Sequence, residues 1–458
     1  MGNKENILGT VRVSRLMFKF AIPSIIAMLV GALYNIVDQL FIGNSVGPLG
    51  NAATNIAFPL STSCVAMALL FGIGGASCFN LDMGKGDAKK APHYIGNAVV
   101  MMLFFGILLM GVTLIWLEPL LKIFGAPDDV MPYAVEYTKI TALGFPFLVL
   151  TTGGGHLIRA DGSPKMTMFV SLLGAVINIF LDALFVLGFG WGMTGAAFAT
   201  IIGQFISGAV VLWYLKGFKT VPLKLEHFKP SVRIIGKTMS IGMASFINQL
   251  AMMIVQIVLN NYLRKYGGLS EFGEAIPIAC AGIIMKVNMI VFAVIIGLGQ
   301  GTQPIESYNY GAKKFDRVRE AYRLAIMVGG VIAVIAFAMF QIFPREIISL
   351  FGDGSPEYFE FGVSFFRIFM FFTWINFIQP ITSTFFTSIG KPIKGAILSL
   401  SKNIICFLPA LFILPSFFGI YGILLTGPIA DFLAAILNVV LIVFEFRLMR
   451  KEEKALCA

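Results

Sequence analysis

The chain is built from long apolar segments separated by short polar ones. A helix of about 20 apolar residues crosses the hydrocarbon core of a bilayer. The segments are too long and too evenly apolar for the strands of a membrane barrel, which alternate with period two. We therefore predict an all-α polytopic membrane protein with about twelve transmembrane helices, at residues 16–42, 51–80, 93–117, 132–157, 165–189, 192–215, 235–263, 275–305, 319–343, 358–388, 393–415 and 419–445.

The composition excludes a soluble protein. Hydrophobic residues make up 57% of the chain and charged residues only 13%, and the mean hydropathy is +0.86. A soluble chain of 458 residues needs more charge to stay dissolved. The net charge of +10 lies in short clusters between apolar segments, which is typical of topology signals. We expect the lipid bilayer as a partner and no nucleic acid.

The basic clusters alternate along the chain. They occupy residues 4–19, 85–90, 159–165, 216–237, 313–323, 391–402 and 447–454. The connections between them are poor in Lys and Arg. Because Lys and Arg accumulate on the cytoplasmic side, this pattern predicts a multi-pass protein of the cell membrane with both termini in the cytoplasm.

The chain also repeats itself. The segment GIGGASCFNLDMGKGDAKK (72–90) matches GLGQGTQPIESYNYGAKKF (297–315) at a shift of 225 residues, and DGSPK (161–165) matches IGKPI (389–393) at 228. Parallel repeats are a transporter architecture with the substrate path between the halves. We predict an amino-terminal lobe (1–215), a cytoplasmic linker (216–234), a carboxyl-terminal lobe (235–447) and a tail (448–458).

Two acids interrupt the apolar segments of the first half. Asp38 lies five residues before Gly43, where the first predicted helix ends, and Asp182 lies seven before Phe189, where the fifth ends. At helical rise these positions are roughly 8 and 10 Å from the outer ends. A charge at the bilayer centre costs about 2.5–3.5 kcal/mol even on insertion scales, so such residues usually line ion pathways.

Polar neighbours accompany both acids. Tyr34 and Asn35 share a helix face with Asp38, Asn178 shares one with Asp182, and Thr200 reaches a similar depth on the sixth helix. Oxygen ligands of these types suit a sodium ion, whereas two close carboxylates in a low dielectric suit a proton. The sequence leaves the choice between H⁺ and Na⁺ open, and we expect no other metal. A purely structural role, with each acid paired or capping a helix break, is the alternative.

The second half carries different polar residues. The positions that match the two acids hold Ala410 and Ile257. Amides replace them as candidates for contact with substrate, together with one lysine and one acid: Gln256, Asn376, Gln379, Lys286 and Asp431. Lys286 has two possible roles, lining the cavity or forming an ion pair with Asp431.

No catalytic constellation is present in the sequence. There is neither an HExxH motif nor a serine–histidine–acid arrangement, and the five cysteines show no metal-ligand spacing. We therefore expect a protein that is not an enzyme and that needs no cofactor.

Several of these segments together resemble the multidrug and toxic compound extrusion (MATE) family, and within it the bacterial subgroup of MepA-type exporters. The resemblance extends from Val11 to Arg447 and rests on AIPSIIAMLVGALYNIVDQLFIG (21–43), IRADGSPK (158–165), NIFLDALFVLGFG (178–190), GMTGAAFAT (192–200) and GLGQGTQPIESYNYGAKK (297–314).

The resemblance implies a V-shaped fold of two six-helix lobes and a cation site in the amino-terminal lobe. The family's site residues correspond here to Asp38, Asn178, Asp182 and Thr200, and its hinge proline to Pro23. Some relatives also carry acids in helices seven and ten, where this chain has Gln and Asn, so the resemblance does not extend to a second cation site.

The predicted function is multidrug efflux: organic, often cationic, drug-like compounds leave the cell in exchange for H⁺ or Na⁺ by alternating access. We expect a monomer. Two other transport functions remain open, flipping of a lipid-linked saccharide and export of one endogenous metabolite. A flippase needs a strongly cationic cavity for its pyrophosphate, and few basic residues lie inside the predicted helices.

Overall fold

The structure is a computed structural model that describes residues 6–273, 275–351 and 355–457. Residues 1–5, which include Lys4 of the first basic cluster, lie outside the described residues. The described chain is helical, without strands. After the short helix α1 (Ile7–Thr10), one bundle consists of α2 (Val13–Ser45), α3 (Pro48–Gly84), α4 (Ala91–Ile115), α5 (Leu117–Ile123), α6 (Met131–Thr141), α7 (Phe145–Ala160), α8 (Pro164–Asp182) and α9 (Gly192–Lys216).

A second bundle follows the linker. It consists of α10 (Val232–Gly268), α11 (Ala275–Gly311), α12 (Phe315–Ile342), α13 (Pro344–Ser349), α14 (Pro356–Phe369), α15 (Thr373–Asn376), α16 (Ile378–Ser388), α17 (Pro392–Leu400) and α18 (Leu408–Cys457). Two π-helical segments interrupt the regular helices, at Ala183–Gly188 and Ser401–Phe407. We refer to α2–α9 as the amino-terminal bundle and to α10–α18 as the carboxyl-terminal bundle.

The helices agree with the predicted number of membrane crossings. Among the described residues, ten helices are long and apolar enough to cross a membrane, and the bent pair α14 and α15–α16 adds one more. One of the ten, Pro392–Ala455, contains two arms that meet at the non-helical Gly419. Counting these arms separately gives twelve crossings. The predicted helix 358–388 is a broken one, with a bend of 42° between its parts.

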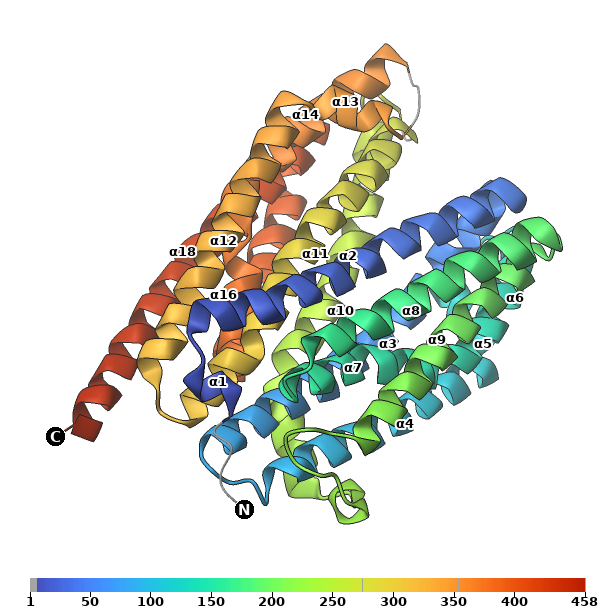
Figure 1. Ribbon diagram of the computed structural model, residues 1–458. Coiled ribbons are helices and arrows are strands. Elements are labelled where there is room, and N and C mark those ends of the chain that lie inside the picture. Colours follow the sequence, from blue (N-terminus) through green and yellow to red (C-terminus); the bar gives the residue numbers. More distant parts are fainter. Residues whose placement is uncertain (1–5, 274, 352–354, 458) are drawn as a thin grey trace.

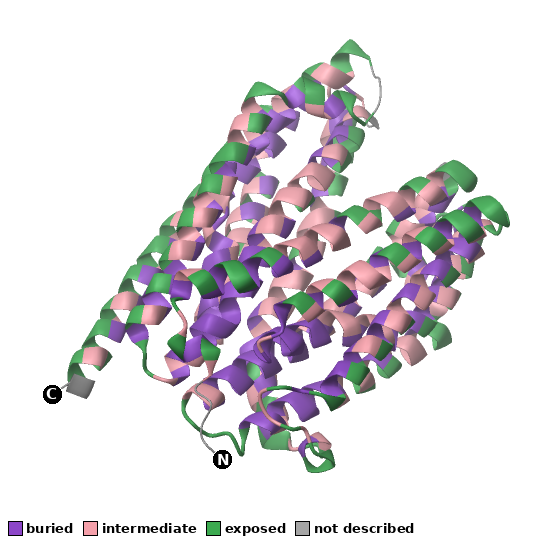
Figure 2. Cartoon of the chain, in the orientation of Figure 1, coloured by how far each residue is buried: buried purple, intermediate pink, exposed green. Residues whose placement is uncertain are grey.

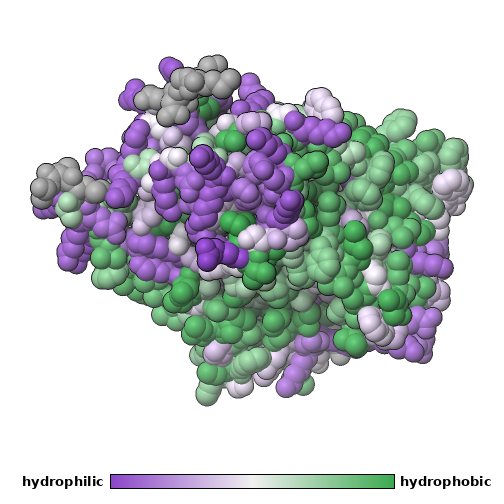
Figure 3. Space-filling view, turned by 90° about the horizontal axis from the view of Figure 1, so that it is seen from below, coloured by the Kyte–Doolittle hydropathy of each residue, from purple (hydrophilic) through white to green (hydrophobic). Residues whose placement is uncertain are grey.

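The surface fits a bilayer. Figure 3, which views the molecule from below, shows hydrophilic residues gathered over one part of the surface and a broad hydrophobic surface beside them. Large apolar side chains of several helices are exposed, among them Phe104, Ile107, Trp213, Val331 and Phe444. Exposed apolar area of this extent is stable only in contact with lipid, so the chain is a multi-pass membrane protein.

The two bundles meet at one end of the molecule and diverge at the other (Figure 1). We call the end where they meet the terminal side, because it holds both termini, and the opposite end the far side. Buried residues concentrate where the bundles meet (Figure 2). The backbones touch there: a Cβ atom on Gly242 of α10 would lie 1.8 Å from the carbonyl oxygen of Leu70 of α3, and one on Gly311 of α11 would lie 2.1 Å from that of Leu81.

Each bundle also holds the segment that leads into the first helix of the other. Leu8 and Leu16 belong to a core cluster formed mostly by α11, α12 and α16, whereas Ile234 and Ile241 belong to the core of the amino-terminal bundle. The predicted lobe boundaries, 1–215 and 235–447, stay a prediction. The structure adds that the start of α2 packs in the carboxyl-terminal bundle and the start of α10 packs in the amino-terminal bundle.

Hydrogen bonds reinforce this packing. The Asn97 side chain of α4 donates to the His227 and Lys229 carbonyls, each at 3.1 Å, and accepts from the Ser231 amide at 2.8 Å. In the same way, Asn309 of α11 donates to the Leu8 carbonyl at 2.9 Å. A movement of one bundle therefore acts directly on the segment that leads into the first helix of the other.

Candidate functional site

Asp38 and Asp182 lie side by side inside the amino-terminal bundle. Asp38 is on α2 with 8% of its surface exposed, and Asp182 is the last residue of α8 and fully buried. The close packing of α2 against α8 brings the two carboxyl groups together. The matched depths predicted from the two helices thus correspond to an actual encounter.

Most of the carboxylate oxygens of these two acids accept no hydrogen bond from the described residues. Among the described residues, neither oxygen of Asp182 has a hydrogen-bond partner, and Oδ1 of Asp38 and Oδ1 of Asn178 have none either. No ion pair to either acid occurs in this part of the chain. Buried charges are stable only when paired or neutralised, so this cluster has unused capacity for a proton or a small cation.

Asn178 and Thr200 complete the predicted set. The Asn178 side-chain amide donates to the Thr200 hydroxyl over 3.5 Å, which joins α8 to α9. The side-chain carbonyl oxygen of Asn178 is left as an unoccupied acceptor. The helix changes to π-helical geometry directly after Asp182, at Ala183–Gly188, and single π turns are frequent at functional sites.

Sequence reasoning missed Tyr137 of α6. Its hydroxyl group approaches Thr200, and it lies close to both acids and to Tyr34. It was overlooked because the fourth span is interrupted: α6 ends at Thr141 and a 3₁₀ turn (Ala142–Gly144) precedes α7. A polar aromatic residue in an otherwise apolar span was the available signal.

The two supporting candidates on α2 behave differently. Tyr34 is close to both acids and to Asn35. Asn35 is exposed, and its side chain donates to the Gly31 carbonyl at 3.2 Å. Pro23, the predicted hinge, is buried inside α2, which continues past it. Because proline removes one backbone hydrogen bond, α2 is locally weakened there.

Two of the carboxyl-terminal candidates, Asp431 and Asn376, contact Lys402, a partner that the sequence did not predict. Lys402 Nζ lies 3.0 Å from Asp431 Oδ1, donates to the Asn376 side chain, and lies 5.5 Å from the centre of the Phe292 ring. Gln379 is buried and donates to Ser399 at 3.5 Å. Asn376 thus belongs to an internally satisfied polar cluster, and Gln379 is satisfied separately by Ser399.

This pair corrects two interpretations of the sequence. Asp431 is paired with Lys402 and not with Lys286, which is half-buried and forms no ion pair among the described residues. The sequence pattern also counted Lys402 with the basic cluster 391–402 that connects two spans, and this interpretation is wrong. The eleventh span begins at Pro392, so Lys402 lies in the π-helical segment Ser401–Phe407 inside the bundle, where its side chain is 14% exposed.

Gln256 of α10 stands apart from both clusters. Its side chain donates to Asn260 at 3.2 Å on an exposed face. In the described residues, no three His, Cys, Asp or Glu side chains lie close enough together to hold a metal ion.

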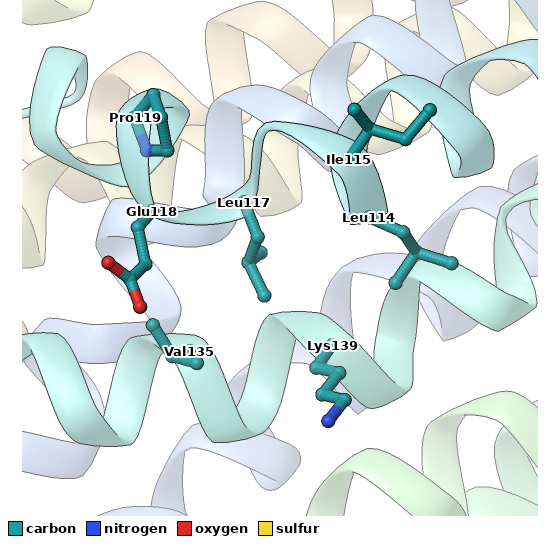
Figure 4. A pocket seen from close by; sticks show the side chains of 7 residues that line it. All are labelled: Leu114, Ile115, Leu117, Glu118, Pro119, Val135 and Lys139. Atoms are coloured by element: carbon teal, nitrogen blue, oxygen red, sulfur yellow. The ribbon is translucent and has the colours of Figure 1, made fainter.

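One open groove lies away from these sites. It has a volume of about 630 Å³ and is lined by Leu114, Ile115, Leu117, Glu118, Pro119, Val135 and Lys139, where α4, α5 and α6 meet (Figure 4). Figure 4 shows Glu118 and Lys139 at separate ends of an otherwise apolar wall. The groove shares no residue with the acid cluster.

Comparison with known proteins identifies the family. The family model described as MatE matches residues 23–184 and 241–413, that is, most of both bundles. The chain belongs to the MATE family. Both matched parts contain the repeated glycine-rich segments or their neighbours, as expected for a MATE protein with two related halves.

Individual relatives cover nearly the whole MATE chain. It is 25% identical to the "Multidrug export protein MepA" of Staphylococcus haemolyticus over 441 residues, which are 96% of this chain and 95% of the relative. It is also 25% identical to MepA of Staphylococcus aureus (strain NCTC 8325 / PS 47), over 95% of this chain and 94% of the relative.

A solved structure shows the same fold. The chain superposes with a TM-score of 0.91 on a "multidrug resistance MATE family transporter of the MOP superfamily" in an outward-facing conformation, with 24% identity and coverage of 98% and 99% of the two chains. The predicted all-α fold with two helical bundles is thereby confirmed.

Proposed function

We propose that this MATE protein is a multidrug efflux antiporter. It exports organic, often cationic, drug-like compounds in exchange for H⁺ or Na⁺ by alternating access, and it confers resistance to antibiotics of that kind. The coupling ion binds at Asp38, Asn178, Asp182 and Thr200, with Tyr137 and Tyr34 at the edge of the site. Support comes from the family and from relatives that are named multidrug export proteins.

One observation carries the proposal: two buried carboxylates lie side by side, and among the described residues neither has a counter-ion and three of their four oxygens accept no hydrogen bond. A protein that only needed structural polarity there would be more stable with apolar residues. An exchangeable cation removes the electrostatic cost while it is bound and restores it when it leaves. This difference is the free energy that an antiporter couples to the movement of its substrate.

We place the terminal side in the cytoplasm of the cell. Basic residues of the terminal side flank the connections at 85–90, 216–237 and 313–323, and such residues accumulate on the cytoplasmic side. With this orientation the two bundles diverge toward the outside of the cell (Figure 1). The outward-open state is the one in which the acids receive an external cation and the drug is released.

Ion binding then drives the reverse movement. A ligand shifts an equilibrium between two states only through its different affinity for them. The acids must therefore differ in water access or in distance between the outward-open and inward-open states. The contact of α2 with both α8 and α11 supplies a physical connection, because α2 carries Asp38 and also packs against the other bundle.

The test is ethidium efflux from energised cells that produce equal amounts of wild type, Asp182→Asn or Asp128→Asn. Asp128 is an exposed acid of the far side and serves as the control. We expect efflux from wild type and from Asp128→Asn, and none from Asp182→Asn. Unchanged efflux in Asp182→Asn would remove Asp182 from the mechanism. No efflux by wild type would contradict the multidrug proposal and favour a lipid or metabolite substrate.

Proteoliposomes identify the ion. Drug uptake is measured with an imposed proton gradient or an imposed sodium gradient, each without the other. The gradient that drives uptake by wild type but not by Asp182→Asn belongs to the coupling ion.

A further inference from the structure

Glu306 is a third buried acid, in the carboxyl-terminal bundle, that the cation site does not include. It lies on α11 with 1% of its surface exposed. Neither of its carboxylate oxygens has a hydrogen-bond partner among the described residues. The internal repeat does not require an acid here, since the shift of 225 residues matches Glu306 with the apolar Leu81 of α3.

The hydroxyl groups around Glu306 use their hydrogens elsewhere. Ser388 of α16 lies close to Glu306, but its hydroxyl donates to the Thr384 carbonyl at 2.8 Å. Tyr322 of α12 also faces it. Thr382 donates its hydrogen to the Ile378 carbonyl at 2.6 Å, so in the 2.8 Å bond between Tyr322 and Thr382 the tyrosine is the donor.

Neither hydroxyl group therefore donates to the Glu306 carboxylate. Among the described residues, no positively charged side chain pairs with Glu306 in place of these donors. Among the titratable side chains of the helices packed against α11, Tyr322 of α12 faces Glu306, and on α7 His156 approaches Gln303, with Arg159 one turn further along. The helices α2 and α3 also pack against α11; α2 carries Arg15 and Lys19 near this end, and α3 carries Asp82, whose carboxylate pairs with Lys85, Lys90 and Lys237. No described basic side chain forms an ion pair with Glu306. A bare carboxylate in this position has neither a donor nor a counter-ion.

Glu306 also lies at the contact that closes the terminal side. Three residues earlier on the same helix face, Gln303 donates to Ser77 of α3 across the two bundles at 2.9 Å. Five residues later, Gly311 meets the Leu81 backbone. Separation of the bundles at this end breaks both contacts and admits water to this part of α11.

We propose that Glu306 is a second proton-binding site, protonated while the terminal side is closed and deprotonated when it opens. In the closed state the proton neutralises the buried carboxyl group. In the open state water solvates the carboxylate, and the proton passes to the aqueous phase of the terminal side. The proposal rests on the proposed transport function and extends it, because proton release from Glu306 favours the inward-open state.

A proton fits this site better than a sodium ion does. The carboxylate has two hydroxyl neighbours on different helices, Ser388 of α16 and Tyr322 of α12. Hard metal cations need several converging oxygen ligands. The acid cluster of the other bundle offers two carboxylates, an amide oxygen and a hydroxyl, and so keeps both ions possible.

The first test is infrared spectroscopy of the whole purified protein. Wild type with ¹³C-labelled glutamate is expected to show, at neutral pH, a carbonyl band of a protonated carboxyl group that shifts with the label. The band is expected to disappear in Glu306→Gln and to persist in Glu320→Gln, where the acid is exposed on α12. Absence of a label-sensitive band in wild type overturns the proposal, whether or not the Gln variant folds.

The second test separates coupling from drug binding. In proteoliposomes, Glu306→Gln is expected to lose ethidium transport driven by a proton gradient, because glutamine resembles the permanently protonated acid, while ethidium still binds. Glu320→Gln is expected to behave as wild type. Gradient-driven transport by Glu306→Gln at the wild-type rate overturns the inference alone. If wild type itself responds to no gradient, the proposed antiport fails, and the infrared result still decides whether Glu306 holds a proton.

Discussion

Lys402 Nζ lies 3.0 Å from Asp431 Oδ1 within the carboxyl-terminal bundle, on two neighbouring parts of the chain on either side of Gly419. The amino-terminal bundle has no equivalent pair, because the shift of 228 residues matches Lys402 with Gly174. Asp38 and Asp182 of the amino-terminal bundle thus lie without a counter-ion among the described residues, whereas Asp431 of the carboxyl-terminal bundle has one that is part of the chain. The tethered ammonium occupies Asp431 and makes it an unfavourable site for an exchangeable cation.

The pair predicts a specific pattern of stability. Lys402→Met leaves Asp431 buried without a partner, and breaking a buried pair in this way costs about 3–5 kcal/mol. The double variant Lys402→Met/Asp431→Leu removes both charges and is expected to recover most of that loss. Thermal unfolding in detergent measures both. A double variant as unstable as the single one would show that the pair is not what stabilises this region.

Tyr137 is expected to contribute to ion coupling. Tyr137→Phe removes the hydroxyl that approaches Thr200 and leaves the ring in place. Loss of one hydrogen bond of this kind costs roughly 0.5–1.5 kcal/mol, so we expect a several-fold weaker coupling ion affinity without loss of folding. The measurement is the ion concentration that gives half-maximal drug uptake in proteoliposomes. Tyr133→Phe, one turn earlier on α6, is the matched control and should leave this concentration unchanged.

The close approach of α10 to α3 is expected to control closure of the terminal side. A methyl group on Gly242 would meet the Leu70 backbone, whereas Gly236 on the same helix has free space around it. We therefore expect Gly242→Ala to hold the bundles apart and to abolish efflux. Gly236→Ala is expected to stabilise α10 by about 0.5–1 kcal/mol, because alanine is the better helix former.

A fluorescent thiol reagent measures the separation directly. A cysteine at Ser77, which is buried where Gln303 crosses from the other bundle, is expected to react faster in Gly242→Ala than in Gly236→Ala, in a background whose natural cysteines are replaced. Equal reaction rates would mean that the helices accommodate the methyl group without opening.

His227 is expected to make the protein sensitive to acid. Burial and the neighbouring His93, whose ring centre is 4.7 Å away, lower the pKa of His227. Lys224 acts in the same direction and Glu226 opposes it. The folded state thus binds the proton less well than the unfolded state, so the stabilisation is complete above about pH 6.5 and declines as the pH falls below it.

The melting temperature measured from pH 8 to pH 5 tests this prediction. His227→Gln removes the titrating group while its side-chain oxygen can still accept from the Lys224 amide, as Nδ1 does in wild type. We expect a smaller loss of stability at low pH for this variant than for wild type. Parallel pH profiles of the two proteins would exclude His227 as the cause.

Sequence alone was sufficient for the architecture because the membrane restricts the possibilities. Apolar length fixes the number of crossings, and lipid permits only helices with all backbone groups satisfied. Asp38 and Asp182 could be singled out for the same reason, since ionisable groups in hydrocarbon are rare and costly. Equal depth on two helices, estimated from the helical rise, was enough to predict that they are neighbours.

Contacts between distant helices depended on the tertiary structure. Helical periodicity does not specify which face meets which partner, so Asp431 could be assigned to Lys286 although Lys402 is its partner. Lys402 was counted with a basic loop because a charge near the end of a span looks the same in sequence whether it faces water or a buried acid. Glu306 became visible as an unsatisfied acid only when the hydrogen bonds of Ser388 and Tyr322 were known. Local hydrophobicity determines how many helices cross the membrane, whereas the pairing of buried polar groups is decided by packing between residues far apart in the chain.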